Sequence, residues 1–367
     1  MYGIHEVLRT QVRADYSENL ATGSYQLDCS MGANPYGAFP GLEIEPDILS
    51  SICDYPYDEP PLKAAIRDLY APVADLTDDM IAFSCGSIGS VMTVNRMVLR
   101  PGKVVISLAP TFSAVTDDIL TYEPVFHYVY LRPERNYQFD LDDLLAAVHA
   151  HPGAYIYIDT PNNPTGQIFP LDEMRTVVTT AEKLDSFVLL DEAYGDYMPL
   201  ENSGVSLVHE FANTAVIRTF AKGMGAAGIR LGYTIGHPDV IAAFNKVNIP
   251  FSVGTITNSL ARQLLASDWI EQSVARIQVD KAKALAALQN LRVGYTYPTV
   301  PISLVYADDP ACDVSALLLE HGIRVISCEE YEGLGSFAAR LNLHHDIETL
   351  VQLLRQADES YGSRKGI

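Results

Sequence analysis

Short apolar runs alternate with helical stretches over residues 80–247. A short apolar run bounded by turn residues is typical of a buried strand, and strands that alternate with helices are typical of a parallel sheet with crossover connections. Seven runs have this form, at residues 81–85, 104–108, 125–130, 154–159, 187–191, 215–220 and 231–235. The pattern predicts an α/β fold with one mostly parallel, seven-stranded sheet of buried strands, covered by helices on both faces.

A different pattern follows the predicted sheet. Apolar residues recur at mainly three-to-four spacing over residues 255–291, which predicts a long helix leaving the sheet domain. The tail then reads as strand 302–306, helix 314–321, strand 323–326, strand 338–343 and helix 347–357, a smaller α+β lobe. We therefore expect an N-terminal segment (1–44) that packs on the small lobe, a large domain (45–255), and a connector helix with a small C-terminal domain (256–367).

Composition narrows the possible partners and location. The chain carries 25 basic and 46 acidic residues, a net charge of −21, which repels nucleic acid backbones and anionic lipid headgroups. Its five cysteines are widely spaced without a CxxC pair, so neither a disulfide framework nor a metal site is expected. No run reaches the roughly 18 apolar residues of a membrane span, and the first residues do not resemble a signal peptide. We expect a cytoplasmic protein that binds neither nucleic acid nor membrane.

Two polar segments directly follow predicted strands, at the sheet edge where open α/β folds bind ligands. Residues 159–166 read DTPNNPTG, which by itself also fits an ordinary turn. Residues 189–194 read LLDEAY, and a carboxylate buried at Asp191 would need a cation or a hydrogen-bond donor. A protonated pyridine nitrogen would serve, although an acid exposed just past the strand end fits the same letters.

A third segment contains Lys222, between a predicted strand and a glycine-rich turn. Desolvation there would lower the pKa of the amine and prepare it for Schiff-base chemistry. Gly223, Gly225 and Gly228 also spell the GxGxxG of dinucleotide-binding folds. That motif belongs at a first βα unit with an acid about 20 residues later, whereas here it comes late and Asp239 follows too soon.

A fourth segment, residues 85–90, reads CGSIGS and enters a predicted helix that runs to about Leu99. Backbone N–H groups and hydroxyls at such a helix start can bind an anion. A tight strand-to-helix turn with a serine cap would have the same sequence.

Taken together and in this order, the segments resemble class I/II aminotransferases of fold type I, which depend on pyridoxal phosphate (PLP), nearest the histidinol-phosphate aminotransferase group. The motifs are residues 163–166 (NPTG), 191–194 (DEAY) and 219–222 (TFAK) with Arg230. The resemblance covers essentially the whole chain and includes residues 34–37 and 55–56.

The resemblance implies a role for each matching residue. Lys222 would hold the cofactor as a Schiff base (aldimine) and move the proton between substrate and cofactor. Asp191 would pair with the pyridinium nitrogen and keep the ring an electron sink. Asn163 and Tyr194 would hydrogen-bond the phenolic oxygen of the ring, and Phe112 would stack on its face.

The remaining implied contacts concern the phosphate, the substrate and a second subunit. The phosphate would be held by Gly86, Ser87, Thr219 and Arg230. Tyr55 would reach the phosphate of the neighbouring subunit, which implies a homodimer with shared sites. Arg340 would bind a substrate carboxylate, or the phosphate in histidinol-phosphate enzymes, with Asn34 as a further substrate contact.

The implied activity is transfer of an amino group between a small amino acid or amino-phosphate and a 2-oxo acid. Enzymes of this fold that decarboxylate, eliminate or cyclise amino acids share the same cofactor residues, so a PLP-dependent lyase, decarboxylase or cyclase of specialised metabolism is the alternative. A non-catalytic ligand-sensing module is a third hypothesis, against which the intact pair Lys222 and Asp191 argues.

Overall fold

The computed structural model describes residues 3–11, 23–56 and 59–365 of the chain. All seven expected strands form one sheet, in the order β2-β8-β7-β6-β5-β3-β4. Only β8 runs against the others in this sheet, so the expected α/β class with a mostly parallel sheet is confirmed. The bounds are β2 Ile81–Cys85, β3 Val104–Ala109, β4 Val125–Tyr130, β5 Tyr155–Asp159, β6 Phe187–Asp191, β7 Thr214–Thr219 and β8 Leu231–Gly236.

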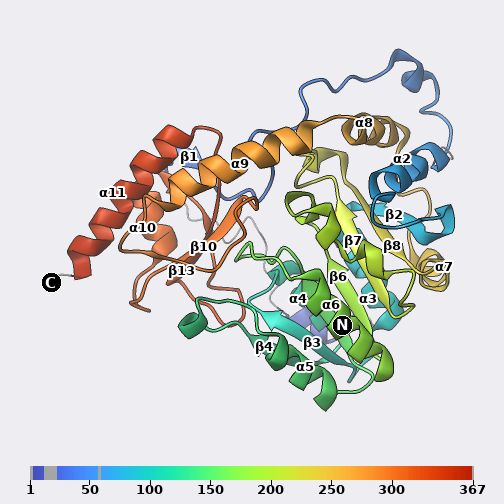
Figure 1. The fold of residues 1–367 in the computed structure, drawn as a ribbon, viewed down its shortest axis with the longest axis horizontal. Helices are drawn as coiled ribbons and strands as arrows, with labels where there is room; N and C mark the ends of the chain where they lie inside the picture. Colours follow the sequence, from blue (N-terminus) through green and yellow to red (C-terminus); the bar gives the residue numbers. More distant parts are fainter. Residues whose placement is uncertain (1–2, 12–22, 57–58, 366–367) are drawn as a thin grey trace.

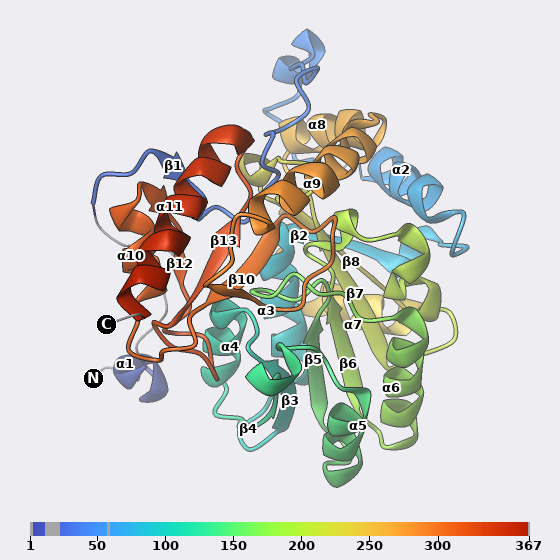
Figure 2. The same ribbon diagram turned by 60° about the vertical axis from the view of Figure 1, so that its left-hand side comes forward.

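Helices cover both faces of this sheet (Figures 1 and 2). Ile156 and Val188 pack in the core that includes α5 (Leu141–Ala150) and α6 (Leu171–Lys183). Tyr155 and Leu189, one residue away on the same strands, pack instead with α3 (Gly86–Val98), α4 (Ser113–Leu120) and α7 (Pro238–Val247). Side chains alternate along a strand, so each central strand contributes to both cores, and each fully buried aliphatic side chain stabilises the fold by about 1.5–3 kcal/mol.

The strand β4 is less buried than its sequence predicts. It lies at the edge of the sheet and pairs only with β3, so one side lacks a neighbouring strand. Val125 is 54% exposed and Tyr130 47% exposed, at the two ends of the strand. The apolar run predicted a strand correctly, but edge position decides burial and cannot be read from one run.

Two helices, rather than one long helix, connect the sheets. α8 spans Thr255–Leu265 and packs on α2 (Pro60–Tyr70), whereas α9 spans Trp269–Leu285. The expected continuous helix is wrong because the hydroxyl of Ser267 donates to Leu264 O (2.7 Å) and Asp268 is the N-cap residue of α9. The Ser267 hydroxyl bonds a backbone carbonyl of the last turn of α8, a local contact that competes with continuation of the helix, whereas the Asp268 side chain makes no capping hydrogen bond. The chain changes direction at this break (Figure 1).

A second sheet of four strands, in the order β12-β13-β10-β9, forms the smaller C-terminal lobe. The expected strand 323–326 is divided, because its two halves pair differently: β11 pairs with β1 near the N-terminus, and β12 pairs with β13. The bounds are β1 Leu27–Asp28, β9 Arg292–Val293, β10 Ile302–Tyr306, β11 Ile323–Arg324, β12 Ile326–Ser327 and β13 Ala338–Asn342, with α10 at Val314–Glu320 and α11 at Ile347–Lys365.

The last helix, α11, continues beyond the expected end at residue 357. Asp358 accepts hydrogen bonds from the backbone of Asn290 and Leu291 (2.9 and 2.8 Å), and the hydroxyl of the buried Tyr361 accepts one from Asp308 N (3.1 Å). These contacts with distant residues stabilise the final turns, where the local apolar spacing no longer predicts a helix.

The N-terminal segment makes contacts in three places rather than with the small lobe alone. Gln11, next to the short helix α1 (Val7–Thr10), donates to Asp117 O in α4 (2.7 Å). Cys29 N donates to Arg324 O in the small lobe (2.8 Å), and Trp269 donates to Gly37 O (3.0 Å). The part of the expected segment at residues 1–2 and 12–22 lies outside the described residues.

Short 3-10 helices complete the structure, at Pro46–Ser50, Asp78–Met80, Pro133–Arg135, Gly195–Tyr197, Leu200–Asn202, Gly204–Leu207 and Ala227–Ile229. Within the described ranges, every helix is too short or too polar to cross a lipid bilayer.

Candidate active site

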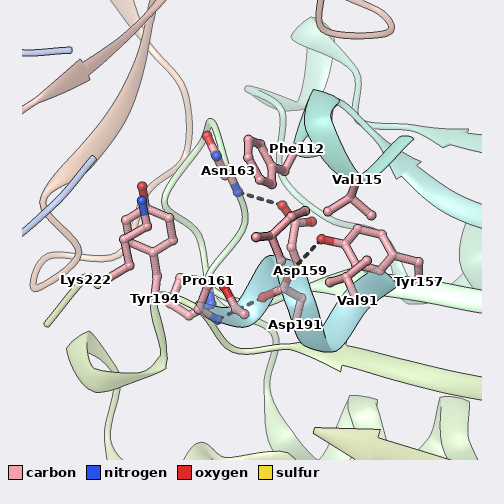
Figure 3. Close-up of a pocket in the computed structure, with 13 residues that line it drawn as sticks. Val91, Phe112, Val115, Tyr157, Asp159, Pro161, Asn163, Asp191, Tyr194 and Lys222 are labelled. Carbon is pink, nitrogen blue, oxygen red and sulfur yellow. Dashed lines mark hydrogen bonds between the residues drawn. The ribbon is translucent and has the colours of Figure 1, made fainter. Parts of the chain in front are cut away.

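A pocket lies at the carboxyl edge of the large sheet (Figure 3), where open α/β folds bind their ligands. Six of the residues that the sequence predicted as site residues line it, namely Ser87, Phe112, Asn163, Asp191, Tyr194 and Lys222. The other lining residues are Ile88, Val91, Val115, Tyr157, Asp159, Pro161 and Ala193.

Asp191 is the last residue of β6 and is 5% exposed. Burial raises the pKa of its carboxyl to about 6, opposed by hydrogen bonds from Tyr157 Oη (2.8 Å) and Ala193 N (3.0 Å) and by the charge of Lys222. The desolvated carboxylate favours a further cation in the pocket. Sequence analysis missed Tyr157, although strand alternation places it on the same face of β5 as Asp159, beside Asp191.

Asp159 is a second buried carboxyl, beside Asp191 in the pairing of β5 with β6. It accepts hydrogen bonds from Thr111 Oγ1 (2.9 Å), Asn162 Nδ2 (2.9 Å) and Asn163 N (2.8 Å). Burial raises the pKa of Asp159 to about 7, and the negative charge of Asp191 acts in the same direction. The sequence placed Asp159 at the start of the DTPNNPTG segment without assigning it a role. The structure shows that it fixes the loop that presents Asn163.

Lys222 and Tyr194 lie together on one side of the pocket (Figure 3), with Lys222 Nζ 5.1 Å from the centre of the Tyr194 ring. The N–H groups of Asn34 and Gly225 both donate to Lys222 O (3.1 and 3.0 Å). Tyr194 Oη donates to Gly32 O (3.0 Å). The N-terminal segment therefore fixes both the backbone of Lys222 and the ring beside its amine.

A buried ion triad lies behind Lys222. Arg218 pairs with Glu192 Oε2 (2.9 Å) and with Asp196 Oδ1 (2.6 Å), and all three side chains are buried. Asp196 also accepts hydrogen bonds from the backbone N–H groups of Gly223 and Met224. Because removing one partner of a buried ion pair costs about 3–5 kcal/mol, the triad holds the backbone on both sides of Lys222 firmly. Sequence analysis quoted Glu192 within a motif but predicted no role for it or for Arg218.

The start of α3 forms the opposite end of the site. Gly86 has a positive φ of +71°, and a Cβ there would lie 2.8 Å from Arg230 Nη2, so glycine lets the guanidinium approach the first helical turn. Ser87 in the same turn lines the pocket. Thr219, the last residue of β7, donates its hydroxyl to Leu231 O of the neighbouring strand β8 (3.1 Å). A helix N-terminus beside an arginine suits a phosphate.

Six predicted site residues lie outside the pocket lining, namely Gly86, Thr219 and Arg230, described above, and Tyr55, Asn34 and Arg340. Tyr55 is 69% exposed and packs against Phe251 with the two rings tilted and their centres 4.9 Å apart. Asn34 is buried, and its side-chain amide donates to Gly223 O (2.8 Å) and Ser273 Oγ (2.9 Å). The structure therefore gives Asn34 a contact with the Lys222 loop instead of a place in the pocket wall.

Arg340, the last of these six residues, contacts one residue of the pocket wall. It lies on β13, is 1% exposed, and donates to Asn163 Oδ1 (3.3 Å) and Ser30 O (2.5 Å). Tyr331 Oη donates to the same Asn163 oxygen (3.3 Å). The guanidinium of Arg340 is therefore hydrogen-bonded directly to Asn163, a residue of the pocket wall.

This arrangement matches the three functional groups of PLP. The buried carboxylate of Asp191 would pair with a ring nitrogen, the amine of Lys222 would meet an aldehyde, and the helix start beside Arg230 would hold a phosphate. The fold and the site together are those of a fold type I PLP-dependent enzyme.

The chain belongs to the family described as aminotransferase class I and II, which matches residues 53–356. Histidinol-phosphate aminotransferase 2 of Nitrosospira multiformis is 32% identical over 71% of this chain, an alignment that spans 66% of that relative. The chain is therefore a PLP-dependent aminotransferase, and the expected family, cofactor and activity are confirmed.

Solved structures of this fold are similar over nearly their whole length. Histidinol-phosphate aminotransferase from Sinorhizobium meliloti in complex with PLP has a TM-score of 0.76 at 19% identity, with 98% of each chain covered. Aspartate aminotransferase from Thermus thermophilus with maleate has a TM-score of 0.82 at 19% identity, covering 98% of this chain and 100% of that one. At this identity the likeness shows the fold and leaves the substrate open.

Proposed function

We propose that this enzyme transfers an amino group between a small amino acid or amino-phosphate and a 2-oxo acid, with Lys222 as its base and Arg340 as the group that binds the substrate anion. The observation that carries the proposal is that Lys222 and the buried Asp191 line one pocket whose wall residue Asn163 is bonded to Arg340. When bound, PLP supplies an electron-withdrawing ring that stabilises negative charge at the substrate Cα.

Asp191 holds the cationic form of the ring nitrogen, because a carboxylate buried at 5% exposure gains most from a charged partner. Tyr157 keeps that carboxylate in place by donating to Oδ2. Lys222 Nζ would take up and return the proton of the substrate Cα, and Tyr194 and Asn163 would orient the ring through its phenolic oxygen. Ser87, Thr219 and Arg230, with the backbone N–H of Gly86, would hold the phosphate, and Phe112 would cover one face of the ring.

Arg340 binds the substrate carboxylate or phosphate. Its hydrogen bonds to Asn163 and Ser30 are with neutral oxygens, and an anion that replaces them gains a charge-assisted, bidentate partner. Because an anion would compete with Asn163 for the guanidinium, its binding would be coupled to a residue of the pocket wall.

We further propose that the enzyme is a homodimer in which Tyr55 completes the phosphate site of the other subunit. Exposed apolar side chains occur on the neighbouring segments 44–55 and 249–251, as expected of a surface that a second copy covers. They are Ile44, Leu49, Ile52, Tyr55, Ile249 and Phe251.

A subunit-mixing experiment tests the shared site. Tyr55→Phe subunits mixed with Lys222→Ala subunits should form hybrids with one doubly defective site and one intact site, which restores activity above both parents. Absence of restored activity after proven subunit exchange would place Tyr55 in its own chain's site.

We place the enzyme in the cytoplasm, because all five cysteines are free thiols in the structure, as a reducing compartment favours.

The function is tested by incubating the PLP-loaded enzyme with 2-oxoglutarate and single amino donors, and measuring glutamate. The first donors are histidinol phosphate, aspartate and aromatic amino acids, which span phosphate, carboxylate and apolar side chains. Donor-dependent glutamate supports the proposal. Carbon dioxide release or elimination without glutamate would instead support the lyase alternative.

A further inference from the structure

A buried lysine lies outside the pocket, on the connector helix α9. Lys281 is 2% exposed, yet no carboxylate forms an ion pair with it among the residues that the structure describes. Its Nζ instead donates to four neutral oxygens from the turn 296–302, namely Thr296 Oγ1 (2.6 Å), Tyr297 O (2.8 Å), Val300 O (2.7 Å) and Ile302 O (3.1 Å).

The four oxygens match a cation. Burial lowers the pKa of Lys281, but the oxygens act in the opposite direction, because three of them are carbonyls that can only accept. An ammonium group supplies three N–H donors, whereas a neutral amine supplies two and directs a lone pair at the remaining oxygens. A ring of carbonyl oxygens is also how proteins bind a potassium ion in place of its hydration shell.

The turn that surrounds Lys281 also contacts the loop of Asn163. Tyr297 N donates to Gly166 O (2.9 Å). Gly166 has a positive φ of +74°, and a Cβ there would overlap Ile302 O and lie 2.7 Å from Thr296 Oγ1. Since both atoms are ligands of Lys281, the loop that presents Asn163 lies directly on the oxygen cage.

The same turn contacts two further parts of the site. Thr299 Oγ1 donates to Tyr197 O, in the 3-10 helix Gly195–Tyr197 that follows Tyr194. Leu343 N donates to Pro301 O (3.0 Å) at the end of the strand that carries Arg340. The turn therefore joins the two pocket segments to the small sheet.

We propose that Lys281 is a positioning residue whose ammonium group acts as a tethered monovalent cation, and that the cage it fills is a latent site for potassium or ammonium. It holds the turn 296–302 against the segments of Asn163 and Tyr194. The cage itself follows from geometry alone, and only its effect on the cofactor rests on the proposed function.

The test compares Lys281→Ala with wild type and with Lys283→Ala, a control two positions along the same helix, where Lys283 is 49% exposed. Hydrogen exchange of peptides covering 294–303 and 160–168 is measured in the cofactor-loaded protein at equal concentrations of potassium, ammonium or tetramethylammonium chloride. The rate of PLP release is the second readout.

In tetramethylammonium chloride, we expect exchange of both peptides in Lys281→Ala to be about tenfold faster or more, since four oxygens lose their hydrogen bond from Lys281. Potassium or ammonium should return it toward wild type and slow PLP release in parallel, whereas wild type and Lys283→Ala should respond to no salt. Unchanged exchange in Lys281→Ala would overturn the proposal. Acceleration that is equal in all three salts would also overturn it, because the oxygens would then not hold a cation.

If Lys281→Ala does not fold, variants of Thr296 test the proposal instead. Among the four oxygens of the cage, the Thr296 hydroxyl is the one that belongs to a side chain. Thr296→Ser keeps the oxygen and should exchange like wild type, whereas Thr296→Val removes it and should exchange faster in both peptides. Equal behaviour of the two variants would overturn the proposal. A wild-type enzyme that transfers no amino group would reject the proposed function and leave these exchange results standing.

Discussion

The two regions that meet at the pocket bury opposite charges in different ways. At the carboxyl edge of the large sheet, Asp159 and Asp191 are buried side by side, and burial raises the pKa of both. In the small lobe and its connector, Arg340 and Lys281 are buried against neutral oxygens. The edge of the large sheet therefore carries buried carboxyls that favour a cationic ligand, whereas the small lobe and its connector carry buried cationic side chains.

This difference assigns a ligand to each region. The carboxylates of the large sheet suit the positively charged ring of the cofactor, and Arg340 suits the anionic group of a substrate. Because Asn163 is hydrogen-bonded to both Asp159, through its backbone N–H, and Arg340, through its side chain, it is the point of contact between the two regions. Substitutions on either side should therefore have separable effects.

The largest effect should come from Lys222→Ala, which removes the amine at the carboxyl edge of the large sheet. We expect kcat/KM to fall roughly 10⁴- to 10⁶-fold, as when a nucleophile or base is deleted. Borohydride treatment followed by peptide mass spectrometry should find cofactor bound covalently to wild type and to the exposed-lysine control Lys246→Ala, but not to Lys222→Ala. A covalent adduct that persists in Lys222→Ala would reject the assignment.

Asp191→Asn should have the next largest effect, because the amide cannot stabilise a cationic ring nitrogen. We expect kcat to fall about 10²- to 10³-fold with a smaller change in KM, since the interaction matters most as charge develops in the transition state. Steady-state kinetics with the best donor measures the split. Wild-type turnover in Asp191→Asn would remove Asp191 from the site.

Arg340→Lys tests the other region. Lysine keeps the charge but loses the bidentate fork, so KM for an anionic donor should rise roughly 10- to 100-fold, about 1.4 to 3 kcal/mol. PLP affinity should be nearly unchanged, because Arg340 lies on the substrate side. If KM stays at the wild-type value for all active donors, the substrate is bound elsewhere.

The smallest effect concerns Asp159 and stability. Its pKa of about 7 in the folded protein exceeds the ~3.9 of an unfolded chain, so the folded state binds the proton more tightly. This contribution is fully present below the unfolded pKa and is lost as the pH rises through about 7. Between pH 5.5 and 8, wild type without cofactor should lose about 2 kcal/mol that Asp159→Asn does not lose. Urea unfolding at each pH, with the exposed-acid control Glu201→Gln, measures the difference, and parallel curves for wild type and Asp159→Asn would contradict it.

Much of the large domain could be predicted from the sequence because its determinants are local. Apolar runs marked all seven strands of the large sheet, and polar residues directly after β5 and β6 marked its ligand-binding edge. Six predicted site residues line the pocket, since each belongs to a short motif whose position relative to a strand end fixes its location. The roles of the site residues remain predictions, which the experiments above test.

Other features depend on residues that are far apart in the sequence, and only the tertiary structure decided them. The run 323–326 divides because its halves meet different strands, and α11 extends because Asp358 and Tyr361 bond distant backbone groups. Tyr157 becomes part of the site only because β6 lies beside β5. Lys281 is buried because the turn 296–302 folds around it and accepts its hydrogen bonds, which no sequence pattern indicates. The physical reason is the same in each case: a buried polar group must find its partners in space, and periodicity along the chain does not specify them.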